Sequence, residues 1–107
     1  MVSDKPIEFK GSSYADLIAF PKDAMHEAGY QLSRLQSGRE PDDWKPMKTV
    51  GPGVQEIRIS EESGAFRVFY VVNRPEAIYV LHAFRKTTQK TEKRDIDLAK
   101  ARLKEIG

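Results

Sequence analysis

Hydrophobic positions are densest in three neighbouring segments of the second half of the chain, and each segment has the length and composition of a β-strand. The segments are Val54–Ile59, Phe66–Val72 and Ala77–Phe84. The middle one, FRVFYVV, is apolar almost throughout, as a central strand buried on both faces would be. Only short turns separate the segments, so the pattern predicts antiparallel neighbours.

The first half of the chain predicts a short strand followed by two helices. The strand is expected at Ile7–Phe9. Ser13 followed by Asp16 fits a variant of the capping box, so a helix is predicted to begin near Tyr14. Pro21 suits the first turn of a second helix. That helix has an apolar stripe at helical spacing, made of Met25, Ala28, Leu32 and Leu35.

A segment rich in proline and glycine separates the helices from the three strands. Residues 39–53, with the sequence REPDDWKPMKTVGPG, are predicted to form a connecting loop. A long loop within a small domain favours a functional role. The alternative is that Trp44, a large apolar residue in this segment, simply pins the loop to the core.

The end of the chain predicts a third helix. Thr91 is a candidate N-cap, and the acidic residues that follow it are favourable near the positive end of a helix dipole. The buried stripe of this helix is expected to be Ile96, Ala99, Leu103 and Ile106. The predicted order is β-α-α-β-β-β-α. This order places the chain in the α+β class, with a small and mainly antiparallel sheet in a single domain over residues 1–107.

Length and composition narrow the classes of protein. A chain of 107 residues and 12.2 kDa is long enough for one domain with one modest core. It has no cysteine, which excludes disulfides and a cysteine nucleophile. No apolar run is long enough to span a membrane, and the N-terminus lacks the apolar core of a secretory signal. We therefore expect a cytoplasmic protein that does not act at membranes. No metal-ligand cluster is visible, so neither a metal nor a cofactor is expected.

The charge is unevenly distributed along the chain. The net charge is only +2, but the segment from His82 to the end carries +4 and residues 1–81 carry −2. A basic pole of this kind can attract nucleic acid. It can equally be a solvated helix face.

The segment LHAFRKTTQKT, followed by IDLAKARLKEI, resembles the RelE/ParE toxin superfamily. The resemblance extends to FPKDAMHEAGYQLSRLQSG, KPMKTVGPGVQEIRI and FRVFYVV, and it is strongest to the HigB-like, phage-related branch. It implies a RelE-like fold and a toxin of a type II toxin–antitoxin system. Such toxins are commonly ribosome-dependent endoribonucleases that cleave mRNA by attack of its own 2′-hydroxyl, without a metal. The implied partners are the ribosome, mRNA and a cognate antitoxin, expected to be a helix-turn-helix protein.

Other functions stay open at this point, because one fold can carry several activities. ParE relatives act on DNA gyrase without hydrolysis, so a gyrase inhibitor is one alternative. An inactive relative that only binds its antitoxin is another. A nucleic-acid-binding adaptor with no toxin role is a third.

Metal-free RNA cleavage requires a base, an acid and cations that stabilise the phosphate. Arg67 is the first catalytic candidate, because it interrupts an apolar strand and the resemblance implies a phosphate-contacting arginine there. Its alternative is an ion pair with Glu56 or Glu61. Arg58, on the preceding strand, is predicted to bind RNA in the same groove, or else to form a surface pair with a glutamate. Glu56 occupies a position on the same face where the resemblance implies a further base.

His82 and Lys86 complete the predicted catalytic set. The ordinary pKa of histidine suits proton transfer near neutrality. Strand alternation groups His82 with Ile78, Val80 and Phe84, so a core-edge role is the alternative. No tyrosine follows Tyr79, so proton transfer is left to His82, a lysine or another group. The predicted RNA-binding set is completed by Arg85, Lys90, Lys45 and Lys48.

Overall fold

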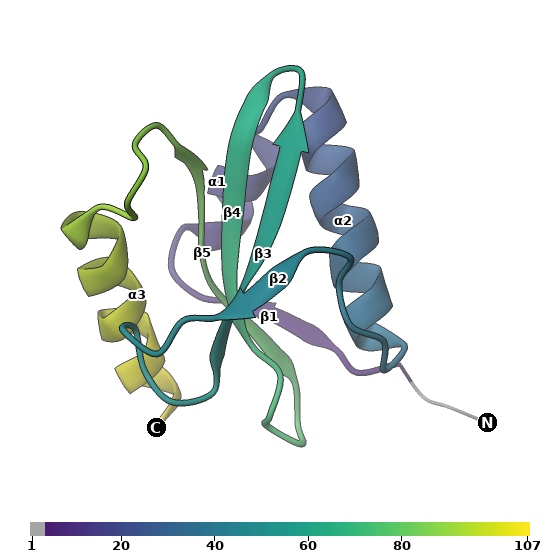
Figure 1. Cartoon of the computed structure of the whole chain (residues 1–107). Helices are drawn as coiled ribbons and strands as arrows, with labels where there is room; N and C mark the ends of the chain where they lie inside the picture. Colours follow the sequence, from purple (N-terminus) through teal and green to yellow (C-terminus); the bar gives the residue numbers. More distant parts are fainter. Residues whose placement is uncertain (1–3) are drawn as a thin grey trace.

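The computed structural model describes residues 4–107, which form a mixed α+β fold with a five-stranded sheet and three helices (Figure 1). The strands are β1 (Ile7–Phe9), β2 (Trp44–Pro46), β3 (Val54–Glu61), β4 (Gly64–Val71) and β5 (Ile78–Lys86). The helices are α1 (Ser13–Ile18), α2 (Lys22–Gln36) and α3 (Lys93–Ile106). None of these helices has both the length and the apolar character that crossing a membrane requires.

The sheet has the strand order β1-β5-β4-β3-β2. The hairpins β3–β4 and β4–β5 are antiparallel, as their short turns predicted, and β1 joins the outer side of β5 in parallel. Because β1 pairs only with residues 78–80, the rest of β5 extends beyond it. The central position of β4 explains its apolar sequence, since side chains on both of its faces are buried.

The two faces of the sheet are covered by different helices (Figure 1). On one face, α1 and α2 pack against side chains that include Ile57, Phe66, Val68 and Tyr70. On the other, α3 and the loop after β2 pack against a second apolar cluster that includes Phe69. Side chains of β4 alternate between the two clusters, as a period of two requires.

The prediction of a continuous loop at residues 39–53 was wrong. Within it, Trp44–Pro46 form β2, which pairs antiparallel with β3, and Lys45 lies opposite Glu56. A strand of three residues ending in proline has too short a pattern to be recognised, and its pairing with β3 defines it. The predicted order therefore lacked one strand.

The alternation expected for His82 was also wrong in part. A bulge between Val80 and His82 shifts the phase of β5, because Tyr70 pairs with Val80 and Phe69 pairs with His82. Val80 consequently lies in the cluster under α1 and α2, whereas His82 contacts Phe69 and Phe84 on the α3 face.

Two predicted helix caps were displaced by one residue. Ser12, not Ser13, precedes α1, and its hydroxyl donates to the Asp16 carboxylate at 2.8 Å. Ser13 is buried and donates to the Val80 carbonyl oxygen. The third helix begins at Lys93 with Glu92, rather than Thr91, in the cap position.

Candidate nucleic-acid interface

Four lysines from separate segments surround one open hollow of about 630 Å³. Lys45 comes from β2, Lys48 from the loop after it, Lys86 from the end of β5, and Lys90 from the loop before α3. Lys45, Lys48 and Lys90 are exposed, and Lys86 is half-buried. All four were predicted site residues, and tertiary structure brings them together. Clustered ammonium groups in a concave surface are suited to a polyanion backbone.

Neutral side chains complete the hollow. Gln89 and Thr91 offer amide and hydroxyl groups for phosphate or sugar, and Thr49 offers a hydroxyl from the loop after β2. Ile96 of α3 and Met47 supply apolar surface. The hollow is lined by β2 and the loop after it, by the end of β5 and by the segment leading into α3, which lies beside β5 (Figure 1).

Arg67 lies on the same face of the sheet as Lys45 and Lys86. It is buried, with 7% of its surface exposed, and its Nε lies 3.8 Å from Oε1 of Glu56. Its Nη1 donates to the Phe66 carbonyl oxygen at 2.9 Å. The ion pair with Glu56, which was the alternative interpretation of Arg67, is therefore present.

Glu56 is fully buried, with 0% of its surface exposed. Among residues 4–107, neither of its carboxylate oxygens has a hydrogen-bond partner, and neither does Nε of Arg67. The 3.8 Å separation is a charge–charge contact rather than a hydrogen bond. From the sequence, Glu56 stood out only because the family resemblance implies a basic residue at its position. Its burial and its neighbouring cations depend on the pairing of β3 with β2 and β4, which the sequence alone does not give.

The pKa values of this cluster shift in the directions that burial imposes. Burial raises the pKa of Glu56, and the positive charges of Arg67, Lys45, Lys86 and Arg58 only partly oppose this. Burial lowers the pKa of Arg67, against the attraction of Glu56. Burial also lowers the pKa of Lys86, and the charge of Arg67 lowers it further. For both members of the Glu56–Arg67 pair, desolvation therefore outweighs mutual attraction.

Arg58 and Arg67 are direct neighbours across the β3–β4 hairpin. Like charges directly opposite one another are destabilising. The structure thus keeps two arginines side by side and places a buried carboxylate near them. Charged groups assembled at a cost in stability are characteristic of functional sites.

Arg85 is separated from this cluster. Strand β5 continues to Lys86, so consecutive side chains at its end point to opposite faces. The Arg85 guanidinium lies 5.4 Å from the ring centre of Phe66 and donates to the Ser63 carbonyl oxygen. Arg85 was predicted to bind RNA together with the lysines, but it lines a different hollow from theirs.

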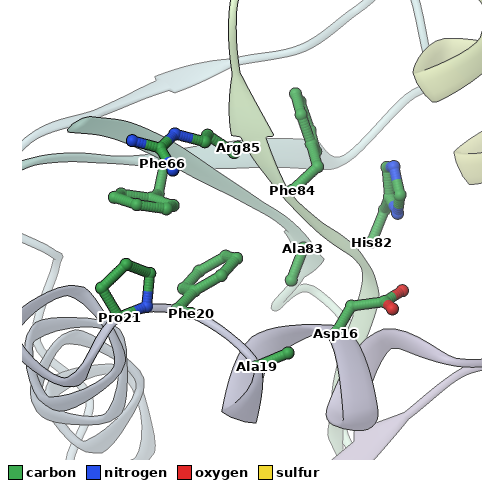
Figure 2. A pocket seen from close by; sticks show the side chains of 9 residues that line it. All are labelled: Asp16, Ala19, Phe20, Pro21, Phe66, His82, Ala83, Phe84 and Arg85. Carbon is green, nitrogen blue, oxygen red and sulfur yellow. The ribbon is translucent and has the colours of Figure 1, made fainter. Parts of the chain in front are cut away.

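A second hollow, of about 390 Å³, lies between β5 and α1 (Figure 2). Figure 2 shows Arg85 over Phe66 at one end, and His82 with Asp16 at the other. Phe20 also lines this hollow, which is more aromatic than the lysine hollow.

His82 lines the second hollow and not the lysine hollow. It is buried, its Nε2 lies 2.7 Å from Oδ1 of Asp95 in α3, and its ring stacks on Phe84 at 4.8 Å. Within residues 4–107, Nδ1 of His82 has no hydrogen-bond partner. The structure thus uses His82 to join β5 to α3, and it does not bring this histidine to the lysines. Across the same residues, no group of three or more His, Asp or Glu side chains is arranged to hold a metal ion.

Comparison with known proteins gives the chain a family. The family model of phage-derived Gp49-like proteins (DUF891) matches residues 15–104. No curated protein matches the chain. The matched region contains both hollows and every predicted site residue. Gp49-like proteins are associated with toxin–antitoxin systems, in which an antitoxin is the expected partner. The chain therefore belongs to the phage-derived Gp49-like family, a family of RelE-like toxins.

Proposed function

We propose that this protein is the toxin of a type II toxin–antitoxin system and acts as a ribosome-dependent mRNA endoribonuclease of the HigB-like type. The observation that carries the proposal is the convergence of Lys45, Lys48, Lys86 and Lys90 on one hollow. Arg67 and Arg58 add charge on the same sheet face. Cytoplasmic mRNA on the ribosome is the polyanion that this family context makes relevant.

In the proposed reaction, the 2′-hydroxyl of one nucleotide attacks the adjacent phosphorus and the 5′-oxygen of the next nucleotide leaves. The neutral amine of Lys86 accepts the proton of the 2′-hydroxyl, because the lowered pKa of this lysine increases the fraction of neutral amine. The leaving 5′-oxygen takes a proton from solvent, so the products are a 2′,3′-cyclic phosphate and a 5′-hydroxyl. Lys45, Lys48 and Lys90 stabilise the charge that develops on the phosphate. Arg67 contributes positive potential from its buried position, and no step requires a metal.

The decisive variant is Lys86→Ala. A positioned acid or base contributes roughly 10²–10⁴-fold in rate, so mRNA cleavage should fall by about that factor. Cleavage would be measured by primer extension on messages in a translating extract. The matched control is Lys104→Ala, because Lys104 is an exposed lysine on α3 outside the hollow.

Thermal unfolding shows whether the Lys86→Ala variant folds normally. If the folded variant still cleaves mRNA as fast as the unmodified protein, Lys86 has no part in the reaction.

Lys45→Ala and Lys48→Ala should weaken RNA binding and flatten its dependence on salt, because each removes one phosphate contact. If the salt dependence of RNA binding is unchanged in both variants, the RNA does not bind in the lysine hollow.

A second candidate function is non-hydrolytic inhibition of gyrase, as in ParE-like proteins. The observation that favours it is the engagement of His82 by Asp95, which leaves no histidine in the lysine hollow. A plasmid supercoiling assay run beside the primer extension separates the two. Loss of supercoiling without cleaved messages would select gyrase, and cleaved messages with normal supercoiling would select the nuclease.

A further inference from the structure

Glu56 is a buried carboxylate surrounded by positive charge, and the reaction proposed above does not use it. We propose that Glu56 is an internal counter-anion that substitutes for an RNA phosphate in the free protein and takes up a proton when a phosphate backbone binds. This inference rests on the proposed function only in requiring that the lysine hollow binds RNA.

Glu56 is buried among cations that come from several strands. Lys45 is its direct partner across the β2–β3 ladder. Arg67 approaches it from β4 at 3.8 Å, and Arg58 is two residues along on the same face of β3. Lys86 contributes from β5. Four strands therefore direct cations toward one carboxylate.

The remaining elements near this surface carry no competing acid in the hollow itself. Along the described chain, the loop after β2 contributes Lys48, the loop before α3 contributes Lys90, and α3 presents Ile96. Asp43, just before β2, acts electrostatically on Arg67. Glu56 is thus the negative charge held within the cationic group, and Asp43 lies at its margin.

The carboxylate is held by charge alone. Its oxygens accept no hydrogen bond from residues 4–107, so its ionised form depends on the neighbouring cations. Lys45 and Lys86 both line the hollow and act on Glu56, so a phosphate bound by these two lysines brings a second negative charge near the carboxylate. Repulsion between the two anions then favours the protonated form of Glu56, and burial already favours it. The proton comes from solvent, and no covalent bond to the RNA changes.

Two measurable consequences follow from this competition. Binding coupled to uptake of one proton strengthens by up to about tenfold for each unit of pH decrease, within the window between the free and bound pKa values of Glu56. Removing the charge with Glu56→Gln should strengthen binding roughly threefold to tenfold at pH values where Glu56 is ionised, because the competing anion is gone.

The experiment is calorimetric titration of a short 2′-O-methyl RNA oligonucleotide, which lacks the attacking hydroxyl. Titrations at one pH in two buffers with different ionisation enthalpies report the protons taken up on binding. The unmodified protein should take up as much as one proton, and Glu56→Gln should take up none and bind more tightly. Glu61→Gln is the matched control, because it removes the same charge from the end of the same strand.

Lys86 is a second group near the hollow that can take up a proton when an anion binds, since its pKa is lowered. The variant Lys86→Arg removes this source, because a guanidinium stays charged throughout the pH range. Proton uptake that persists in Lys86→Arg and disappears in Glu56→Gln assigns the proton to Glu56. Uptake lost in Lys86→Arg and kept in Glu56→Gln overturns the inference.

RNA binding in the lysine hollow and proton uptake by Glu56 are tested by different outcomes. An unmodified protein that does not bind the oligonucleotide overturns both the RNA-binding function and the inference. Tight, salt-dependent binding without proton uptake overturns the inference alone. Where Glu56→Gln does not fold, carboxyl ¹³C NMR of the unmodified protein with and without oligonucleotide reports the protonation of Glu56 directly. A Glu56 signal that stays that of an ionised carboxylate on binding contradicts the proposal.

Discussion

The two faces of the sheet use the same strands for opposite purposes. The face under α1 and α2 is apolar across β3, β4 and β5, with Ile57, Ile59, Phe66 and Val68 all almost completely buried. The face toward α3 is apolar only in part. Beyond the second apolar cluster it carries Glu56, Arg58, Arg67 and Lys86, and of these Glu56 and Arg67 are buried.

The difference between the faces shows where the protein accepts a loss of stability. Packing on the α1 and α2 face removes apolar area from water and supports the fold. The α3 face holds a buried ion pair whose desolvation outweighs its attraction, next to two arginines in register. We infer that the charges on this face are retained for binding, and that the opposite face stabilises the domain.

The largest expected effect on stability tests the apolar face. Phe66→Ala should lower the free energy of unfolding by about 3–5 kcal/mol, because it empties a site that is 99% buried beneath Phe20 and Arg85. Urea unfolding followed by circular dichroism measures this loss. A loss below about 1 kcal/mol, which is typical of surface positions, would contradict the assignment of this face as the stabilising core.

The second test compares single and paired changes at the charged face. Arg67→Met alone should lower the free energy of unfolding by about 3 kcal/mol, because it leaves Glu56 buried without its nearest cation. The double variant Glu56→Leu/Arg67→Met should recover this loss and reach neutral or higher stability, since it removes both desolvated charges. Both variants are expected to lose RNA binding or cleavage. A double variant less stable than the single one would mean that the pair supports the fold.

The smallest effect is the pH dependence of stability. The pKa of Glu56 is raised in the folded protein above its ordinary value of 4.5, so the folded state binds this proton more tightly than the unfolded state. Stability should therefore fall as pH rises from about 4.5 toward the folded pKa, by at most about 1.4 kcal/mol per pH unit, and then level off.

Other carboxyls give the opposite trend at lower pH. Hydrogen bonds lower the pKa values of Asp23 and Glu76, so their contribution is lost as pH falls. Thermal unfolding of the unmodified protein and of Glu56→Gln across pH 4–8 isolates the contribution of Glu56 as a difference. Parallel curves for the two proteins would show that Glu56 does not titrate differently in the folded state.

Much of the fold could be predicted from the sequence, because its main elements have long and regular patterns. The apolar run FRVFYVV and the stripe from Met25 to Leu35 are properties of neighbouring residues, and they identified β4 and α2. The basic character of the chain end was equally visible. Lys45, Lys48, Lys86 and Lys90 were selected as site residues, and they lie around one hollow.

The site could be predicted less well, because its geometry depends on pairing between distant segments. The bulge that turns His82 toward α3 leaves no mark in the sequence of β5. Strand β5 continues for two residues beyond its predicted end at Phe84, and this continuation puts the side chains of Arg85 and Lys86 on opposite faces of the sheet.

The sequence by itself determined the class of fold, the two amphipathic helices and the apolar strands, because side-chain periodicity is a local property that the chain carries before it folds. Only the tertiary structure decided that Lys45 would face Glu56 and that Arg67 would be buried beside it. Those relations arise when β2 pairs with β3 and when β3 pairs with β4. The free energy of a charge depends on its surroundings in space, and for Glu56 those surroundings come from four different strands.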